Sequence, residues 1–160
     1  MTPRRVLFVC TGNSCRSVMA EYLLRDLLQR AGVAGVTVES AGAFAIDGMT
    51  ATRETLRVLQ DAEIDAYPHR SRALTTAIID EADLMLAMEP LHVDEIVRRV
   101  PQARGKTHLL KTYGAAPLAA GERPNIPDPI GKPLEVYEVC FAEIRAAVER
   151  VAKSFGAQVA

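Results

Sequence analysis

Near its start the chain reads VLFVCTGNSCRS over residues 6–17, and this segment decides the fold class. Residues 6–9 form an apolar run of strand length, and apolar residues recur at helical spacing from about residue 17 onward. Between them lies a turn with Gly12 and Asn13, two residue types that tolerate positive φ. A buried strand that leads directly into a helix is the repeating unit of a parallel α/β sheet. The segment therefore predicts the first strand, turn and helix of such a sheet.

The same alternation continues along the rest of the chain. Further strands are expected at residues 36–38, 84–88 and 107–110, and further helices at about 50–59, 75–81, 89–100 and from Pro133 onward. The last helix should pack an apolar face that includes Val136, Tyr137 and Cys140. Residues 111–132, rich in proline and glycine, form a long loop of the kind that usually has a function. We expect an α/β fold in which residues 1–160 form a single three-layer domain, with a four-stranded parallel sheet covered by helices on both faces.

The composition limits the partners that this domain can bind. With 160 residues, 49% of them hydrophobic and 24% charged, the chain is typical of one globular domain. Nineteen Lys and Arg against 20 Asp and Glu leave a net charge of −1, so no broad positive field exists for nucleic acid or an anionic membrane. No apolar run has the length of a membrane span or of a complete signal sequence, which favours a cytoplasmic location. An anion site, if present, must be local.

The three cysteines, Cys10, Cys15 and Cys140, are expected to be free thiols in that compartment. No Cys-x-x-Cys pair or suitable histidine spacing completes a zinc site, so we expect neither a metal nor another cofactor. Cys140 falls on the apolar face of the last helix and should be a packing residue.

The turn at residues 10–17 has the features of an anion cradle with a thiol at its base. Ligands of open α/β sheets bind outside the carboxyl ends of strands, where Cys10 stands. The turn can direct backbone N–H groups inward, the following helix adds its positive end, and Arg16 can add a bidentate guanidinium. Cationic surroundings favour a thiolate nucleophile, to which Ser17 could donate a hydrogen bond. The alternative is that Cys10 is a small apolar residue at the end of a strand.

Residues 6–17 closely resemble the phosphate-binding loop of the low-molecular-weight protein phosphatases. The resemblance continues, in the family's order, through Met19-Ala20-Glu21, Ser40-Ala41-Gly42, His69, residues 82–88 and Asp128-Pro129. It covers nearly the whole chain, and it implies a four-stranded parallel sheet in a single α/β domain. This agrees with the fold predicted from periodicity.

The resemblance implies a mechanism and assigns its residues. In this family a cysteine attacks phosphorus to form a phosphocysteine, an arginine and backbone amides hold the oxygens, and an aspartate in a late loop protonates the leaving group. The matching residues are Cys10, Arg16 and Asp128. The remaining residues of the phosphate-binding loop are Thr11, Gly12, Asn13, Ser14 and Cys15, and those that match its supporting residues are Asn13, Ser17, Ser40 and His69.

Each of these assignments has an ordinary alternative. Asp128 could instead form an Asx turn before Pro129, Ser40 could cap a turn, and His69 could be a loop histidine. His92 and His108 match no family residue and are expected to be structural or solvated.

Two positions bear on the substrate. Position 14 is typically isoleucine in the tyrosine-specific branch and threonine in the branch that acts on phosphoarginine, and this chain has Ser14. After Asp-Pro the tyrosine branch carries an aromatic residue, whereas this chain has Ile130 before Gly131, so stacking on a substrate ring is lost. A hydroxyl near the leaving group suits a guanidinium. The expected function is a phosphatase that removes phosphate from phosphoarginine in proteins; the alternative is a low-molecular-weight protein tyrosine phosphatase.

Other functions on this scaffold are less well supported. An arsenate reductase would need further redox cysteines after the third strand, and residues 80–95 contain none. A binding module without catalysis would have lost the nucleophile or the acid, yet both are present. Oxidation could join Cys10 and Cys15 in a reversible disulfide, which mass analysis after mild peroxide would detect. The expected partner is a phosphorylated protein substrate, and the chain is expected to be a monomer or a weak homodimer.

Overall fold

The computed structural model describes residues 2–159. Its elements along the chain are β1 (Arg5–Cys10), α1 (Arg16–Arg30), β2 (Thr37–Gly42), α2 (Arg53–Asp61), α3 (Thr76–Glu81), β3 (Leu84–Ala87), α4 (Pro90–Arg99), the 3₁₀ helix η1 (Pro101–Lys106), β4 (Thr107–Leu109) and α5 (Leu134–Ser154). None of the helices in this range is long and apolar enough to cross a membrane.

The four strands form one sheet in the order β2-β1-β3-β4, and every neighbouring pair is parallel. Strand β1 lies inside the sheet, so Val6 to Cys10 are all buried. The chain moves from β1 to β2 on one side and then to β3 on the other, which places a reversal of strand order beside the carboxyl end of β1. Such a point is where open α/β sheets bind ligands.

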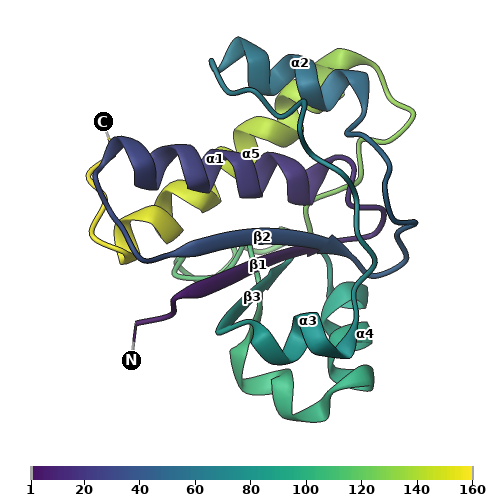
Figure 1. Cartoon of the computed structure of the whole chain (residues 1–160), viewed down its shortest axis with the longest axis vertical. Coiled ribbons are helices and arrows are strands. Elements are labelled where there is room, and N and C mark those ends of the chain that lie inside the picture. Colours follow the sequence, from purple (N-terminus) through teal and green to yellow (C-terminus); the bar gives the residue numbers. More distant parts are fainter. Residues whose placement is uncertain (1, 160) are drawn as a thin grey trace.

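Alternate residues of β1 belong to different cores. Val6 and Phe8 pack in the larger core with the apolar faces of α1 and α5, whereas Leu7 and Val9 pack with Ile79 of α3 and its neighbours. Figure 1 shows α1 and α5 along one face of the sheet, with α3 and α4 on the other. The predicted three layers and the four-stranded parallel sheet are confirmed.

Some boundaries differ from the sequence predictions. Strand β2 runs on to Gly42 because its residues pair in register with β1 as far as Cys10. Helix α2 begins at Arg53, after Thr52 caps it by accepting a hydrogen bond from the backbone N–H of Thr55. The 3₁₀ helix η1 carries no strong sequence signal and was not expected.

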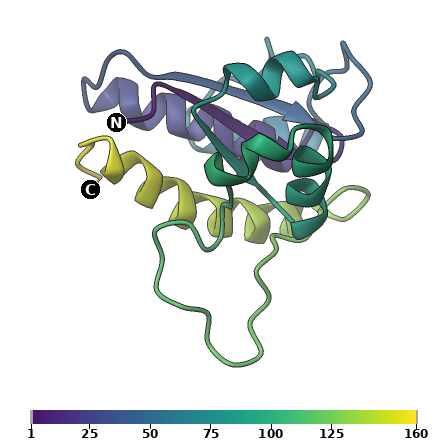
Figure 2. The same cartoon turned by 90° about the horizontal axis from the view of Figure 1, so that it is seen from below.

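Helix α5 begins after Pro133, as expected, but Val136 does not belong to its buried face. The Val136 side chain is 42% exposed, whereas Tyr137 and Cys140 are buried. Val136 lies about 100° around the helix from Tyr137, at the edge of the stripe that packs on α1. The long loop before α5 is confirmed, and Figure 2 shows it extending away from the sheet.

Candidate active site

A cavity of about 180 Å³ lies at the carboxyl end of β1, above the turn into α1. It is lined by Cys10, Thr11, Gly12, Ser14, Cys15, Arg16, Asp128 and Ile130. The tertiary structure thus brings together the predicted nucleophile, the predicted arginine, the predicted acid and both predicted specificity residues, although Asp128 and Ile130 follow more than a hundred residues later in the sequence.

Asn13 holds the turn in its shape. Its backbone has a φ of 54°, in the left-handed region that asparagine tolerates better than most residues. Its fully buried side chain donates from Nδ2 to the hydroxyls of Ser17 and Ser40, both at 2.8 Å. Its Oδ1 accepts from the backbone N–H of Arg72 at 2.9 Å. One side chain therefore ties the turn to α1, to β2 and to the segment after His69.

Cys10 Sγ receives hydrogen bonds from two sides. The backbone N–H of Asn13 lies 3.3 Å from the sulfur, and Ser17 Oγ lies 2.9 Å from it. Because Ser17 Oγ already accepts from Asn13, its own proton is free to point at the sulfur. Donors directed at Sγ are the surroundings that a negatively charged sulfur needs. The predicted contact between Ser17 and Cys10 is present.

Ser40 and His69 contact the turn where the resemblance predicts. Ser40 Oγ accepts from Asn13 and donates to Glu21, a buried carboxylate that also pairs with Arg25. His69 Nε2 lies 2.8 Å from the Asn13 carbonyl, so this nitrogen must be the donor. These contacts make Ser40 and His69 part of the shell that holds Asn13.

Gly42 lets β2 approach the turn. A Cβ atom built on Gly42 would lie 2.5 Å from the Thr11 carbonyl oxygen and 2.9 Å from the Asn13 backbone nitrogen. Both are backbone atoms that cannot move aside without changing the cradle. Only glycine fits at this position, which gives the Ser40-Ala41-Gly42 motif a physical reason.

Two acceptors hold the guanidinium of Arg16 through one of its nitrogens. Its side chain is 1% exposed, and Nη1 donates to Glu89 Oε2 and to the Ile126 carbonyl, both at 2.7 Å. Nε has no hydrogen-bond partner within residues 2–159. Buried polar groups are rarely left unpaired. The unpaired Nε therefore leaves Arg16 with a donor that a bound anion could use.

Asp128 contacts the cavity from the long loop. Its Oδ2 lies 3.4 Å from Arg16 Nη2, and its side chain is 36% exposed. Its Oδ1 also accepts from the Ile130 backbone N–H at 3.1 Å, which is the Asx turn considered from the sequence. The Asx turn is therefore present, and it leaves the second carboxylate oxygen near Arg16, while the role of Asp128 as the acid stays a prediction.

Glu89 and the contacts of His92 are functional features that the sequence did not predict. His92 is fully buried, accepts from the Glu89 backbone N–H at Nδ1 (3.1 Å), and lies 2.8 Å from Thr11 Oγ1 through Nε2. It is structural, as expected, since it caps the start of α4, but it also contacts the cradle. Burial, followed by the charge of Arg16, lowers the pKa of His92 from 6.5 to about 4. The available signal was the position of both residues just after β3, at the same sheet edge as Cys10.

His108, which was expected to be structural or solvated, is exposed.

The other two cysteines lie in different surroundings. Cys15 is buried beside the hydroxyls of Tyr137 at 3.5 Å and Thr52 at 3.6 Å, and burial raises the pKa of the Tyr137 hydroxyl. Cys140 is buried in the core, and burial raises the pKa of its thiol to about 12. All three cysteines are free in the structure, so the pairing of Cys10 with Cys15 stays a prediction.

Within residues 2–159, no group of three or more His, Cys, Asp or Glu could hold a metal ion.

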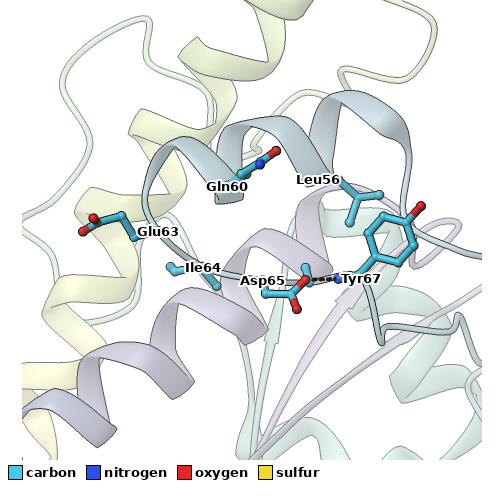
Figure 3. Close-up of a pocket in the computed structure, with 7 residues that line it drawn as sticks. Leu56, Gln60, Glu63, Ile64, Asp65 and Tyr67 are labelled. Atoms are coloured by element: carbon cyan, nitrogen blue, oxygen red, sulfur yellow. Dashed lines mark hydrogen bonds between the residues drawn. The ribbon is translucent and has the colours of Figure 1, made fainter.

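A larger hollow of about 340 Å³ lies between α2 and the segment that follows it (Figure 3). Leu56, Ile64 and Tyr67 give it apolar walls, and its charged residues are Glu63 and Asp65. With carboxylates and no cation or nucleophile among its lining residues, it is unsuited to an anion. The smaller cavity at Cys10 is the candidate active site.

Comparison with protein families gives a match over residues 5–160 to the family described as low molecular weight phosphotyrosine protein phosphatase. The chain belongs to this family. The resemblance of residues 6–17 is thereby confirmed.

Individual members of the low molecular weight phosphatase family extend the match. A protein-arginine-phosphatase of Geobacillus stearothermophilus is 42% identical over 151 residues, which cover 94% of this chain and 95% of the relative. A probable low molecular weight protein-tyrosine-phosphatase, EpsP of Ralstonia nicotianae, is 35% identical over 91% of this chain and 92% of the relative. A solved structure of a YwlE arginine phosphatase mutant with a phosphorylated active-site serine superposes with a TM-score of 0.84 at 34% identity, covering 93% of each chain. The fold is therefore that of this family.

Proposed function

We propose that this chain is a cysteine-dependent protein phosphatase that removes phosphate from phosphoarginine in proteins through a phosphocysteine intermediate. One observation carries the proposal: Cys10, the buried Arg16 and Asp128 line a single 180 Å³ cavity, and the Arg16 Nε has no hydrogen-bond partner within residues 2–159. The YwlE structure with a phosphorylated active-site serine supports a covalent phosphoenzyme in the family.

In the first step the Cys10 thiolate attacks phosphorus from the side opposite the leaving group. Arg16 and the backbone N–H groups of the turn hold the three phosphoryl oxygens. The positive charge of Arg16 and the dipoles of the N–H groups stabilise the negative charge of the transition state. The S–P bond forms as the P–N bond to the substrate arginine breaks. Protonated Asp128 gives its proton to the departing guanidine nitrogen, so no high-energy anion is released.

In the second step water attacks the phosphocysteine. The Asp128 carboxylate takes a proton from that water, the S–P bond breaks, and inorganic phosphate leaves with the Cys10 thiolate restored. The same side chain thus acts first as acid and then as base. Its exposed position, with one oxygen fixed by the Asx turn and one facing the cavity, suits both roles.

Two observations favour phosphoarginine over phosphotyrosine. Ser14 lines the cavity, and its hydroxyl makes only a long contact, to Cys15 Sγ at 3.7 Å, within residues 2–159, so it can meet a polar leaving group. Ile130, at the rim and 51% exposed, cannot stack on a phenyl ring as an aromatic residue would. The identity of 42% to a protein-arginine-phosphatase points the same way. The second candidate is a protein tyrosine phosphatase, which the family description and EpsP support.

We extend the proposal to the setting of the enzyme. A phosphorylated protein is the partner; a net charge of −1 argues against nucleic acid, and three free cysteines suit the reducing cytoplasm. We also propose that residues 1–160 act as a single domain and that the protein is a monomer or a weak homodimer.

The test is phosphate release by the purified chain from p-nitrophenyl phosphate, and then from matched phosphoarginine and phosphotyrosine peptides. We expect turnover of all three, a higher kcat/KM for phosphoarginine, and a loss of at least about 1,000-fold in Cys10→Ser. Cys140→Ala, which removes a buried thiol outside the cavity, is the matched control and should keep its activity. Equal activity in Cys10→Ser would overturn the mechanism, and faster phosphotyrosine turnover would favour the second candidate.

A further inference from the structure

The Thr11 hydroxyl occupies a position that the mechanism above does not use. Thr11 follows the nucleophile directly and lines the same cavity. Its Oγ1 lies 2.8 Å from His92 Nε2 and 3.5 Å from Arg16 Nη2. The direction of its own proton depends on which partner donates at each of these contacts.

The protonation of His92 follows from its other ring nitrogen. Nδ1 lies 3.1 Å from the backbone N–H of Glu89, which can only donate, so Nδ1 must carry a lone pair. His92 is fully buried beside the Arg16 cation and is neutral at pH 7, because its pKa is lowered to about 4. A neutral imidazole with an unprotonated Nδ1 carries its proton on Nε2. Nε2–H therefore donates to Thr11 Oγ1.

Arg16 can also only donate, so Thr11 Oγ1 accepts from two sides, from His92 and, at a longer distance, from Arg16. A hydroxyl has two lone pairs and one proton. With both lone pairs engaged, the proton must point elsewhere, and no acceptor within residues 2–159 takes it. Thr11 lines the same cavity as Arg16, and this cavity is where an acceptor for the free proton can be bound.

We propose that the Thr11 hydroxyl donates a hydrogen bond to a phosphoryl oxygen of the bound substrate, and that His92 is the positioning residue that turns the hydroxyl toward it. The inference rests on the proposed function, because it adds a side-chain donor to the same phosphate cradle. The three residues come from different parts of the fold: Thr11 follows β1, Arg16 begins α1, and His92 lies in the first turn of α4 after β3.

Four variants test the two roles. Thr11→Val removes the hydroxyl at nearly constant shape, and Thr11→Ser keeps it. His92→Asn places an amide where Nδ1 lies and preserves the contact to Glu89, whereas His92→Gln places its amide nitrogen where Nε2 lies and preserves the donor to Thr11.

We expect Thr11→Val to lower kcat/KM for p-nitrophenyl phosphate and to raise the inhibition constant of inorganic phosphate, each about 10- to 150-fold, the usual range for a hydrogen bond to a charged group. Thr11→Ser should stay within about threefold of the parent. His92→Asn should lose about tenfold and His92→Gln should recover most of it. In the Thr11→Val background, His92→Asn should cause no further loss, because its target is already gone.

Three results would overturn the inference. The first is an unchanged phosphate inhibition constant in Thr11→Val. The second is an additive loss in the double variant. The third is that the activity of the His92 variants follows their melting temperatures and not the presence of a donor at the position of Nε2. In that case the role of His92 would be structural only. If Thr11→Val does not fold, the comparison of His92→Asn with His92→Gln decides.

The inference and the proposed function fail in different ways. Absence of turnover in the parent, or turnover that Cys10→Ser does not abolish, refutes the phosphatase itself. Normal parent turnover that depends on Cys10, with Thr11→Val unaffected, refutes only the role of Thr11.

Discussion

Two loops meet at the cavity, and they are built in opposite ways. The turn at residues 11–15 is held by buried contacts, with Asn13 alone bonded to α1, to β2 and to the backbone of Arg72. The loop that carries Asp128 is largely exposed and extends away from the sheet (Figure 2). Asp128 is held there by its own Asx turn and by one ion pair with Arg16.

The difference matches the chemistry that each loop would perform. A cradle for a phosphoryl group stabilises the transition state best when its donors are already in place, so that no reorganisation is needed during reaction. An acid that must give and then take back a proton needs access to water. Its ion-pair partner must also be able to release it when substrate binds. Substrate phosphate would compete for Arg16 and release Asp128 toward the leaving group.

In the comparison of the two loops, the largest expected effect comes from removing the acid. Asp128→Asn keeps the shape of the side chain but cannot donate the proton, so kcat for a phosphoarginine peptide should fall about 100- to 1,000-fold. The melting temperature should hardly change, because the residue is exposed. Steady-state kinetics and a thermal melt measure both. Activity within about threefold of the parent would show that the proton comes from elsewhere.

The buried turn should respond in the opposite way, through stability. Asn13→Ala leaves Ser17, Ser40 and the Arg72 N–H without their partner and puts alanine at a φ of 54°. The free energy of unfolding should drop by about 2–4 kcal/mol, as measured by urea denaturation. Asn125→Ala, in the loop that carries Asp128, is the matched control and should cost less than about 0.5 kcal/mol. Equal effects of the two substitutions would contradict the contrast between the loops.

The buried histidine behind the turn makes stability depend on pH. The pKa of His92 falls from 6.5 to about 4 on folding, so the unfolded chain binds the proton more tightly. The stabilisation is full above pH 6.5 and is lost as the pH falls from 6.5 through about 4, by about 3 kcal/mol in total. Denaturant titrations across this range should show the loss, and His92→Asn should flatten it. His108→Asn, at an exposed site, should leave the slope unchanged.

The smallest effect concerns the choice of substrate. Ser14→Ile exchanges a hydroxyl at the cavity for an apolar side chain, and the ratio of phosphotyrosine to phosphoarginine kcat/KM should rise about tenfold. Ser14→Ala, which loses the hydroxyl without adding bulk, should shift the ratio less. An unchanged ratio in Ser14→Ile would exclude Ser14 as the selector.

Local patterns predicted much of the molecule. The apolar runs located all four strands, and helical spacing located α3 and α4 to within about one residue at each end. Errors fell where a long-range partner decides: β2 is longer than its apolar core because β1 pairs with it, and Val136 is exposed because the packing of α5 on α1 sets which stripe is buried.

The sequence by itself determined the fold class, the family and the order of the residues that line the cavity, because strand periods, turn chemistry and the 6–17 segment are local properties of the chain. Only the tertiary structure decided which distant groups complete the cradle: Glu89 behind Arg16, His92 against Thr11, and Tyr137 beside Cys15. These contacts span from about 70 to more than 120 residues. They exist because parallel strands end at one edge of the sheet and helix packing brings α5 against α1, and neither arrangement is written in any local pattern.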